Sequence, residues 1–311
     1  CSRARVLDAC PRAPAAAAGL DLEYTWHKLG HDDPDLLARV LDGVDCVFTM
    51  VTADVQRATK DEHIRASATG IKDLVAACQR VGVPKLVHLS SIAVTDTFRP
   101  SIEATEDVAL PPIEEYRSAY DLSKRLGEDA VLAACGPDFA AVSLRAGGII
   151  AGPSDYTFRA MWDRPGNVVT LEGTEPFDFI AAQDLCSAAL AAAERLDSPA
   201  VAGQAIFVSK GEPIRAERIA ELIGEKLGWQ VTKLPGIAQT CIGAGMRFSH
   251  KVKEILGQPV PGIAPHDFIQ LPRIQKTFDN SKALHTLGFQ SQIPLEEAVD
   301  RVISEWQASN P

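Results

Sequence analysis

The sequence lacks the patterns that mark several broad classes of protein. Its seven cysteines are scattered, with no C-x-x-C pair and no spacing typical of metal ligands, and its seven histidines are equally dispersed. An odd, scattered set of cysteines favours a reduced intracellular protein over a disulfide framework, and no metal site is predicted. No uninterrupted apolar run reaches the roughly 18 residues that a transmembrane helix needs. We therefore expect no membrane segment within this sequence.

Runs of basic residues are also missing, and the formal net charge is −10. This balance argues against nucleic acid or anionic lipid as the main partner, because nothing is present to neutralise phosphates. The first residue is Cys1, and no charged-then-apolar signal precedes the fold, so the sequence reads as part of a longer chain. A cytoplasmic location is the default expectation. With 311 residues, of which 46% are apolar, a substantial core is expected.

What the sequence does contain is a regular alternation of short apolar segments and longer amphipathic ones. Val, Ile and Leu are frequent in the short segments, which read as strands, and the longer segments have helical periodicity. This pattern predicts a doubly wound α/β fold with a parallel sheet covered on both faces. The expected strands are residues 5–8, 20–26, 44–50, 85–90 and 139–144, and the expected helices are 35–41, 63–81 and 116–135.

Candidate functional residues lie where the expected strands end. Asp8, the pair Ser90-Ser91 and the loop after Leu144 all follow strands, and ligands of doubly wound folds bind beyond those ends. Tyr120 and Lys124 are four residues apart, which places them on one face of a helix. An ammonium at that spacing can stabilise a phenolate, which a free tyrosine with a pKa of about 10 does not supply at neutral pH. Alone, Y-x-x-x-K is a weak signal.

Several motifs in order make the signal more specific. The segments are Leu86-Val87-His88-Leu89-Ser90-Ser91, Tyr120-Asp121-Leu122-Ser123-Lys124, Leu144 to Pro153, Phe177-Asp178-Phe179-Ile180, and Phe278 to Phe289. In this order and spacing the chain resembles the extended short-chain dehydrogenase/reductase family. Within that family it is most similar to the branch of 3β-hydroxysteroid dehydrogenases and decarboxylating sterol-4α-carboxylate 3-dehydrogenases. The resemblance runs nearly end to end.

The resemblance implies a role for each motif residue. Tyr120 would be the general acid/base for the substrate oxygen, and Lys124 would lower the tyrosine pKa and hold the nicotinamide ribose. Ser91 would polarise the reacting oxygen, with Ser90 as the neighbouring alternative. Asp8 would accept from the adenosine ribose hydroxyls, which favours NAD over NADP; the alternative is an ordinary turn aspartate. The implied reaction is oxidation of a 3β-hydroxyl on a small apolar substrate (a steroid, sterol or terpenoid), with loss of carbon dioxide from a 4-carboxylate in one variant.

The resemblance also implies an organisation of the chain. Residues 1–150 would form an NAD(P)-binding Rossmann-like portion, to which 177–209 return, while 151–176 and 210–311 would form a smaller substrate-binding portion. A homodimer is expected through the helices at 63–81 and 116–135, and sterol-acting relatives often sit at the endoplasmic reticulum. The stretch from Leu234 to Met246 has no carboxylate and no lysine, so it is either apolar surface near a ligand or packing beneath the sheet.

The sequence departs from the family mainly at the cofactor cradle. The family's first strand and its G-x-x-G-x-x-G turn, which bring backbone close to the pyrophosphate, are not found before the strand at 5–8. Smaller departures are Lys28-Leu29 in place of an acid-apolar pair, Thr49 to Thr52 in place of a histidine-alanine-alanine run, Ser67 in place of an asparagine, and Ala146 in place of a proline.

Two alternatives remain open. One is a nucleotide-sugar epimerase or dehydratase, or a flavonoid-type reductase, on the same fold. Its diphosphate would need a basic cluster, which Arg159, Arg164 and Arg247 do not form in the sequence. The other is a non-catalytic, truncated homologue, which the missing glycine-rich turn favours and the retained Ser91, Tyr120 and Lys124 oppose. A titration with NAD distinguishes the enzyme from this homologue.

Overall fold

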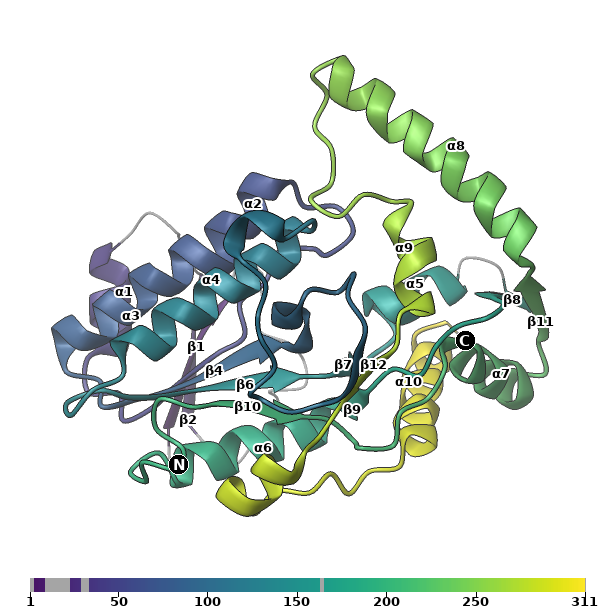
Figure 1. The fold of residues 1–311 in the computed structure, drawn as a ribbon. Coiled ribbons are helices and arrows are strands. Elements are labelled where there is room, and N and C mark those ends of the chain that lie inside the picture. The colour runs from purple at the N-terminus through teal and green to yellow at the C-terminus, as the bar shows by residue number, and fades with distance from the viewer. Residues whose placement is uncertain (1–2, 9–22, 29–33, 163–164, 311) are drawn as a thin grey trace.

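A computed structural model describes residues 3–8, 23–28, 34–162 and 165–310 of the chain. At its centre is a four-stranded sheet in the order β10-β6-β4-β3, with every pair parallel. The strands are β3 (Val47–Thr49), β4 (Lys85–Ser91), β6 (Ala140–Ala146) and β10 (Ala205–Val208). The interiors of β4 and β6 are buried because helices cover both faces (Figure 1). The predicted doubly wound, Rossmann-like α/β fold is therefore confirmed.

Helices on the two faces make two different cores. On one face, α1 (Pro34–Leu41), α3 (Gly70–Val81) and α4 (Ala119–Ala134) lie above the sheet, and Leu86 packs there with Ile71 and Val75. On the other face, α6 (Ala182–Glu194) packs its alanines against Val87 and Leu89. Alternate residues of β4 thus face opposite helical layers, as the pleat of a strand requires.

A second parallel pair, β1 (Arg3–Asp8) and β2 (Glu23–Lys28), is separate from the central sheet. Among the described residues, β3 is the last strand of the central sheet, and no strand pairs with its outer edge. In the described part of the chain the two sheets are therefore separate, and the all-parallel central one is typical of a doubly wound fold.

The helix expected at 63–81 is a continuous helical run with a widened turn inside it. It begins with α2 (Lys60–Ile64), capped by Thr59 and Glu62 in a reciprocal capping box. The next turn, η2 (Arg65–Thr69), is π-helical, and α3 follows directly. Gly82, at φ 76°, ends the run in the left-handed conformation that glycine adopts without strain. The end was predicted correctly, whereas the π turn was not.

The motif helix α4 begins later than predicted. Ser118 is its N-cap, because its hydroxyl accepts from the backbone N–H of Asp121. Tyr116 therefore lies before the helix, after the short 3₁₀ turn η4 (Ile113–Glu115). Near the middle of α4, Gly127 lies against η2, where an added Cβ would be 2.2 Å from the carbonyl oxygen of Ser67. The glycine is what allows the two helical segments to pack so closely.

The remaining elements form smaller parallel pairs and a second core. The paired strands are β5 (Ser101–Ala104) with β12 (Lys276–Phe278), β7 (Gly148–Ile150) with β9 (Phe179–Ala181), and β8 (Asn167–Leu171) with β11 (Gln230–Leu234). The second core lies between α5 (Tyr156–Trp162), α7 (Ala216–Leu227) and α10 (Leu295–Ser309). Trp162, Trp229 and Trp306 pack ring against ring there. The two helical turns not yet named are η3 (Ile92–Thr95) and η6 (Ala283–Leu287).

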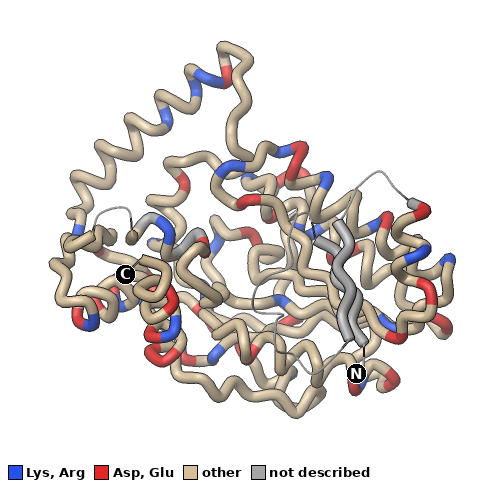
Figure 2. Tube along the Cα trace, turned by 180° about the vertical axis from the view of Figure 1, so that it is seen from behind, with Lys and Arg blue, Asp and Glu red and all other residues tan. Residues whose placement is uncertain are grey.

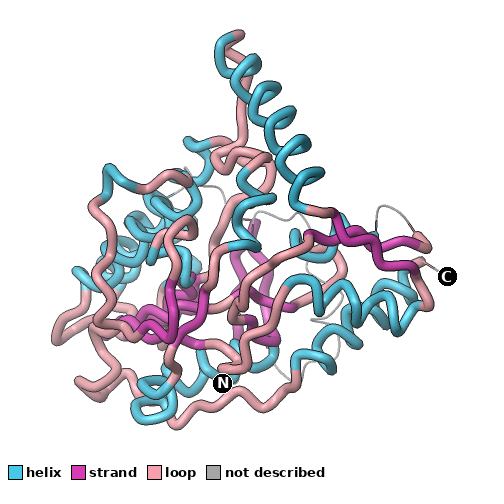
Figure 3. Tube along the Cα trace, turned by 45° about the vertical axis from the view of Figure 1, so that its right-hand side comes forward, coloured by secondary structure: helices cyan, strands magenta, loops and turns pink. Residues whose placement is uncertain are grey.

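One long helix, α8 (Gly236–Ile255), projects from the body of the molecule beside the short α9 (Asp267–Gln270) and η5 (Leu271–Arg273) (Figures 1 and 3). Ile237, Phe248 and Ile255 on it are 82%, 74% and 74% exposed. The stretch 234–246 forms the end of β11 and the first half of this helix, so the option that it packs beneath the sheet is wrong. No helix within the described ranges has the length and apolar character to cross a membrane.

Candidate active site

Tyr120 and Lys124 lie one above the other on the first turns of α4. The Lys124 Nζ is 5.9 Å from the centre of the Tyr120 ring, as the four-residue spacing predicts. Lys124 is only 4% exposed, and burial lowers its pKa from 10.5 to about 8. The lysine therefore keeps its charge at neutral pH in a place with little solvent to screen it. Such an ammonium acts strongly on a neighbouring phenol.

The ammonium is anchored from the other side by the backbone after β3. Lys124 Nζ donates to the carbonyl oxygen of Val51 at 3.4 Å, and Ser67 Oγ donates to the same oxygen at 3.2 Å. Ser67 lies in the π turn η2. Sequence reasoning treated Ser67 and the segment around Val51 only as departures from the family. The structure shows that both belong to the surroundings of Lys124.

Two buried histidines also surround this site, and sequence reasoning missed them. The His63 ring meets the Tyr120 ring edge-on at 5.9 Å between centres, and His88 is on β4, two residues before Ser90. Within the described part of the chain, neither imidazole has a hydrogen-bond partner. Burial is the main cause that lowers both pKa values, that of His88 to about 3, and the Lys124 cation adds to it. Both rings are thus neutral at physiological pH.

The two serines at the end of β4 are in different environments. Ser91 caps the turn η3, and its Oγ accepts from the backbone N–H of Ala93 at 3.1 Å. Ser90 is 5% exposed, and its Oγ has no partner among the described residues. The alternation of β4 places Ser90 on the same face as His88, toward α4. The geometry therefore leaves both serines as candidates for contact with the reacting oxygen.

A buried polar network joins the start of α4 to the C-terminal part of the chain. The Asp121 carboxylate accepts from the backbone N–H and the hydroxyl of Thr97, both at 2.8 Å, and burial raises its pKa to about 7. Lys276 on β12 donates to the Asp96 carbonyl oxygen at 2.6 Å and to the Ser101 Oγ at 3.2 Å, and burial lowers its pKa to about 8. The network fixes the segment after Ser91 against the motif helix.

A second buried contact fixes the middle of α4 to the sheet. The Glu128 carboxylate accepts hydrogen bonds from Nε and one terminal nitrogen of the Arg145 guanidinium, the shortest at 2.8 Å, and another from Ser143 Oγ at 2.8 Å. Glu128 and Arg145 are 1% and 4% exposed. Arg145 also lies over the Phe207 ring, 5.2 Å from its centre. Because this pair is one turn beyond Lys124, it holds the helix at a fixed position over β6.

The other residues singled out from the sequence are not among the described contacts of this cluster. Asp8 is the last residue of β1, and its side chain lies outside what the structure describes. Arg159 pairs with Asp54 at 3.5 Å, Arg164 is outside the described residues, and Arg247 lies on α8. Within the described ranges no three His, Cys, Asp or Glu side chains gather at a metal-binding spacing, and the five described cysteines are free.

Comparison with known proteins gives the family. Residues 5–235 match the model of the 3-beta hydroxysteroid dehydrogenase/isomerase family. The 3beta-hydroxysteroid-dehydrogenase/decarboxylase isoform 2 of Arabidopsis thaliana is 25% identical over 287 residues, which cover 88% of this chain and 50% of that protein. The decarboxylating sterol-4-alpha-carboxylate 3-dehydrogenase of Saccharomyces cerevisiae is 26% identical over 300 residues, with 91% and 83% covered. The chain spans 50% and 62% of the length of two of the Arabidopsis relatives.

Solved structures with the same fold come from other enzymes. MoeE5 in complex with UDP-glucose and NAD superposes with a TM-score of 0.75 at 18% identity, covering 99% of this chain and 91% of that one. A UDP-galactose 4-epimerase gives a TM-score of 0.72 at 16% identity, with 99% and 91% covered. At these identities the likeness shows a shared fold.

Proposed function

Because the chain belongs to the 3-beta hydroxysteroid dehydrogenase/isomerase family, we propose that it oxidises the 3β-hydroxyl of a steroid, sterol or terpenoid-like substrate with NAD. One observation carries the proposal: a buried Lys124 ammonium beside the Tyr120 ring, one helical turn away. The relatives named for decarboxylation favour a variant in which a 4-carboxylate leaves as carbon dioxide after the oxidation. The structures that bind NAD favour it as the cofactor, as does the carboxylate of Asp8.

The described residues fit the nicotinamide end of NAD. Lys124 carries three donor protons, and its described acceptor is the Val51 carbonyl oxygen at 3.4 Å, so protons remain for the hydroxyls of a ribose. The described residues thus account for the nicotinamide end of the cofactor.

The proposed mechanism assigns each side chain one task. The bound cofactor supplies the hydride acceptor. Tyr120 removes the hydroxyl proton, and the Lys124 cation lowers the pKa of the phenol so that it can do so near neutral pH. Ser91 donates its O–H to the same oxygen. Because the Ser91 Oγ already accepts from Ala93, its O–H is a stronger donor. The neutral rings of His63 and His88 are buried beside this pair, His63 against Tyr120 and His88 near Lys124.

The test is oxidation of a 3β-hydroxysteroid such as dehydroepiandrosterone, monitored by the absorbance of the reduced nicotinamide that forms. Tyr120→Phe should lower kcat by about 10²–10⁴-fold, the typical contribution of general acid/base catalysis, with NAD affinity retained. Tyr116→Phe is the matched control, because Tyr116 precedes α4 and its hydroxyl donates to the carbonyl oxygen of Val94 in η3. The control should keep its kcat.

Binding of NAD, measured by calorimetry, separates the alternatives. If neither NAD nor NADP binds at millimolar concentration, the enzyme proposal fails for this chain and the non-catalytic homologue is left. Turnover of a sugar nucleotide without turnover of any 3β-hydroxysteroid would favour the epimerase or dehydratase instead. The homodimer and the cellular location, at the endoplasmic reticulum or in the cytoplasm, stay predictions; light scattering that reports a monomer would remove the first.

A further inference from the structure

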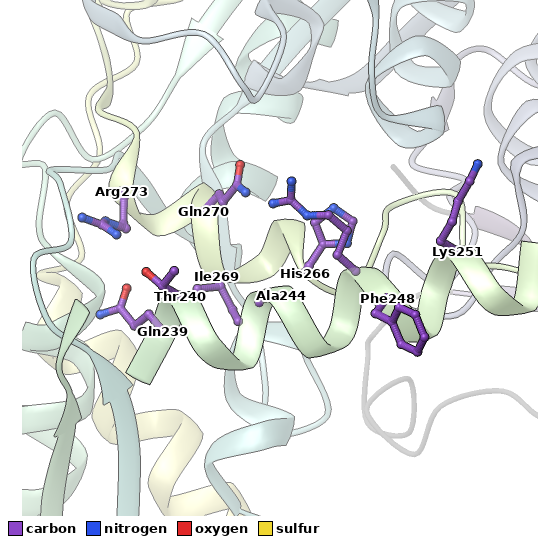
Figure 4. Close-up of a pocket in the computed structure, with 11 residues that line it drawn as sticks. Gln239, Thr240, Ala244, Phe248, Lys251, His266, Ile269, Gln270 and Arg273 are labelled. Carbon is purple, nitrogen blue, oxygen red and sulfur yellow. The ribbon is translucent and has the colours of Figure 1, made fainter. Parts of the chain in front are cut away.

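A cavity of about 710 Å³ lies between α8 and the segment formed by α9 and η5 (Figure 4). Its size falls within the range of roughly 300–1,000 Å³ that is typical of small-molecule sites. At its inner end, Gln239 Nε2 donates to the carbonyl oxygens of Glu172 and Leu234, both at 2.8 Å. Next to it, the buried Gly243 of α8 lies against Ile269 of α9. The base of the cavity is thus fixed by specific contacts.

The charge of the cavity is opposite to that of the protein. Arg247, Lys251 and Arg273 line it, and no carboxylate does, although the whole chain carries −10. The basic positions on α8 are visible in Figure 2. Lys251 pairs with Glu254 on its own helix at 2.7 Å. In the part of the chain that the structure describes, neither Arg247 nor Arg273 has a carboxylate partner. Guanidinium groups bind carboxylates in a planar, two-point geometry.

His266 gives a second indication of an anionic ligand. Its Nδ1 is buried, and no described residue hydrogen-bonds to it. Its ring lies 6.1 Å from that of His250, between centres. Burial lowers the His266 pKa and the Arg247 and Arg117 cations add to the effect, while the Asp267 carboxylate, 3.5 Å from Nε2 on the other side of the ring, opposes it. A buried Nδ1 without a partner, close to the Arg247 cation, is suited to an incoming acceptor group.

The segment that lines the cavity on the α9 side also contacts the start of α4. The backbone N–H of Ala119 donates to the Gly262 carbonyl oxygen at 3.1 Å, and Arg117 pairs with Asp267 at 3.7 Å. Gly262 precedes α9, and Asp267 is its first residue. This segment thus connects the cavity to the end of the helix that bears Tyr120. The apolar lining of Ile269, Ala244 and Phe248 suits the body of a ligand of steroid size.

We propose that this cavity binds the carboxylate at the far end of an apolar, hydroxylated ligand, held by Arg247 and Arg273. The ligand is thus an amphipathic acid, with its acid remote from the hydroxyl that reacts. That the hydroxyl end reaches Tyr120 rests on the proposed dehydrogenase function. The binding of the acid in the cavity does not depend on that function, so it is measured without NAD.

The experiment compares 3β-hydroxy-5-cholenoate with its methyl ester by calorimetry. The acid should bind about tenfold to a hundredfold more tightly, since a hydrogen bond to a charged group contributes that much. Arg247→Gln and Arg273→Gln should each remove most of this difference. Lys253→Gln is the matched control, because Lys253 is on the same helix but does not line the cavity. Acid binding should also raise the His266 pKa, measured by NMR and assigned with His266→Gln.

Three outcomes would overturn the proposal. The first is equal affinity for the acid and its ester. The second is an acid preference that survives both arginine variants. The third is tight binding of UDP-glucose that depends on the two arginines while cholenoate does not bind, since the site would then serve a sugar nucleotide. The two proposals can fail separately. If Tyr120→Phe loses turnover but binds the acid normally, both proposals stand. If neutral 3β-hydroxysteroids are oxidised and the acid does not bind, only the cavity proposal fails.

Discussion

Replacing Gly127 by alanine should loosen the motif helix and slow the reaction together. An added Cβ would lie 2.2 Å from the Ser67 carbonyl oxygen, and ordinary contact begins at 3.4 Å, so α4 and η2 must separate by about 1 Å. Overpacking of this kind costs about 2–3 kcal/mol, and the better helix propensity of alanine offsets about 1. A net loss of about 1–2 kcal/mol in the free energy of unfolding is therefore expected.

The same shift should reach the catalytic pair, because Ser67 and Lys124 share the Val51 carbonyl oxygen. A misplacement of about 1 Å lowers turnover by about a hundredfold. Urea denaturation measures the first effect and steady-state oxidation the second. Gly245→Ala on α8 is the control, because its Cβ would meet nothing within 4 Å and should stabilise the protein slightly. If Gly127→Ala behaved like this control in both assays, the close packing of α4 on η2 would be unimportant.

Three further predictions concern the same helix and the end of β4. Glu128→Ala should lower the free energy of unfolding by about 3–5 kcal/mol, because it leaves Arg145 buried and unpaired. The double variant Glu128→Leu with Arg145→Met should lose much less. Equal losses in urea denaturation would contradict this. Burial raises the Asp121 pKa to about 7, so the stability that its bound proton contributes is lost as the pH rises from about 4 to 7. Asp121→Asn should flatten this fall in the free energy of unfolding. Urea midpoints across this pH range give the slope, and an unchanged slope would exclude Asp121 as its source. Ser91→Ala should lower kcat about 10²-fold and Ser90→Ala much less, and the reverse order in steady-state kinetics would reassign the role.

The periodic parts of the fold could be predicted from the sequence. The apolar stripe of α3 with Gly82 after it, and the buried run of β4 ending in two serines, each contain their own signal. The start of α4 was misplaced because the helical pattern continues upstream, while the Ser118 hydroxyl determines where the first turn forms. The π turn η2 could not be predicted, because the apolar pattern of residues 63–81 is that of an ordinary α-helix.

The site was predictable where its residues are neighbours in sequence. Tyr120 and Lys124 meet because four residues make about one helical turn. The pairing of Glu128 with Arg145 and the burial of Lys276 depend on segments that only the fold brings together, so no local pattern contains them. The same is true of Arg247, which formed no cluster in the sequence, because Arg273, the other arginine that lines the cavity, lies beyond α9 in η5.

The π turn η2 also sets how this region tolerates insertions and deletions. A π turn holds about one more residue than an α turn, so the five residues of Arg65–Thr69 turn the chain about as far as four residues of an α-helix would. Deleting one residue from this segment would therefore restore a uniform helix and leave α2 and α3 facing as they do now. His63 would stay at the edge of the Tyr120 ring, and the apolar stripe of α3 would stay in place. Deleting a residue from α3 itself would instead rotate the two parts of the run by about 100°, so the π turn is the place in this run that accepts a deletion.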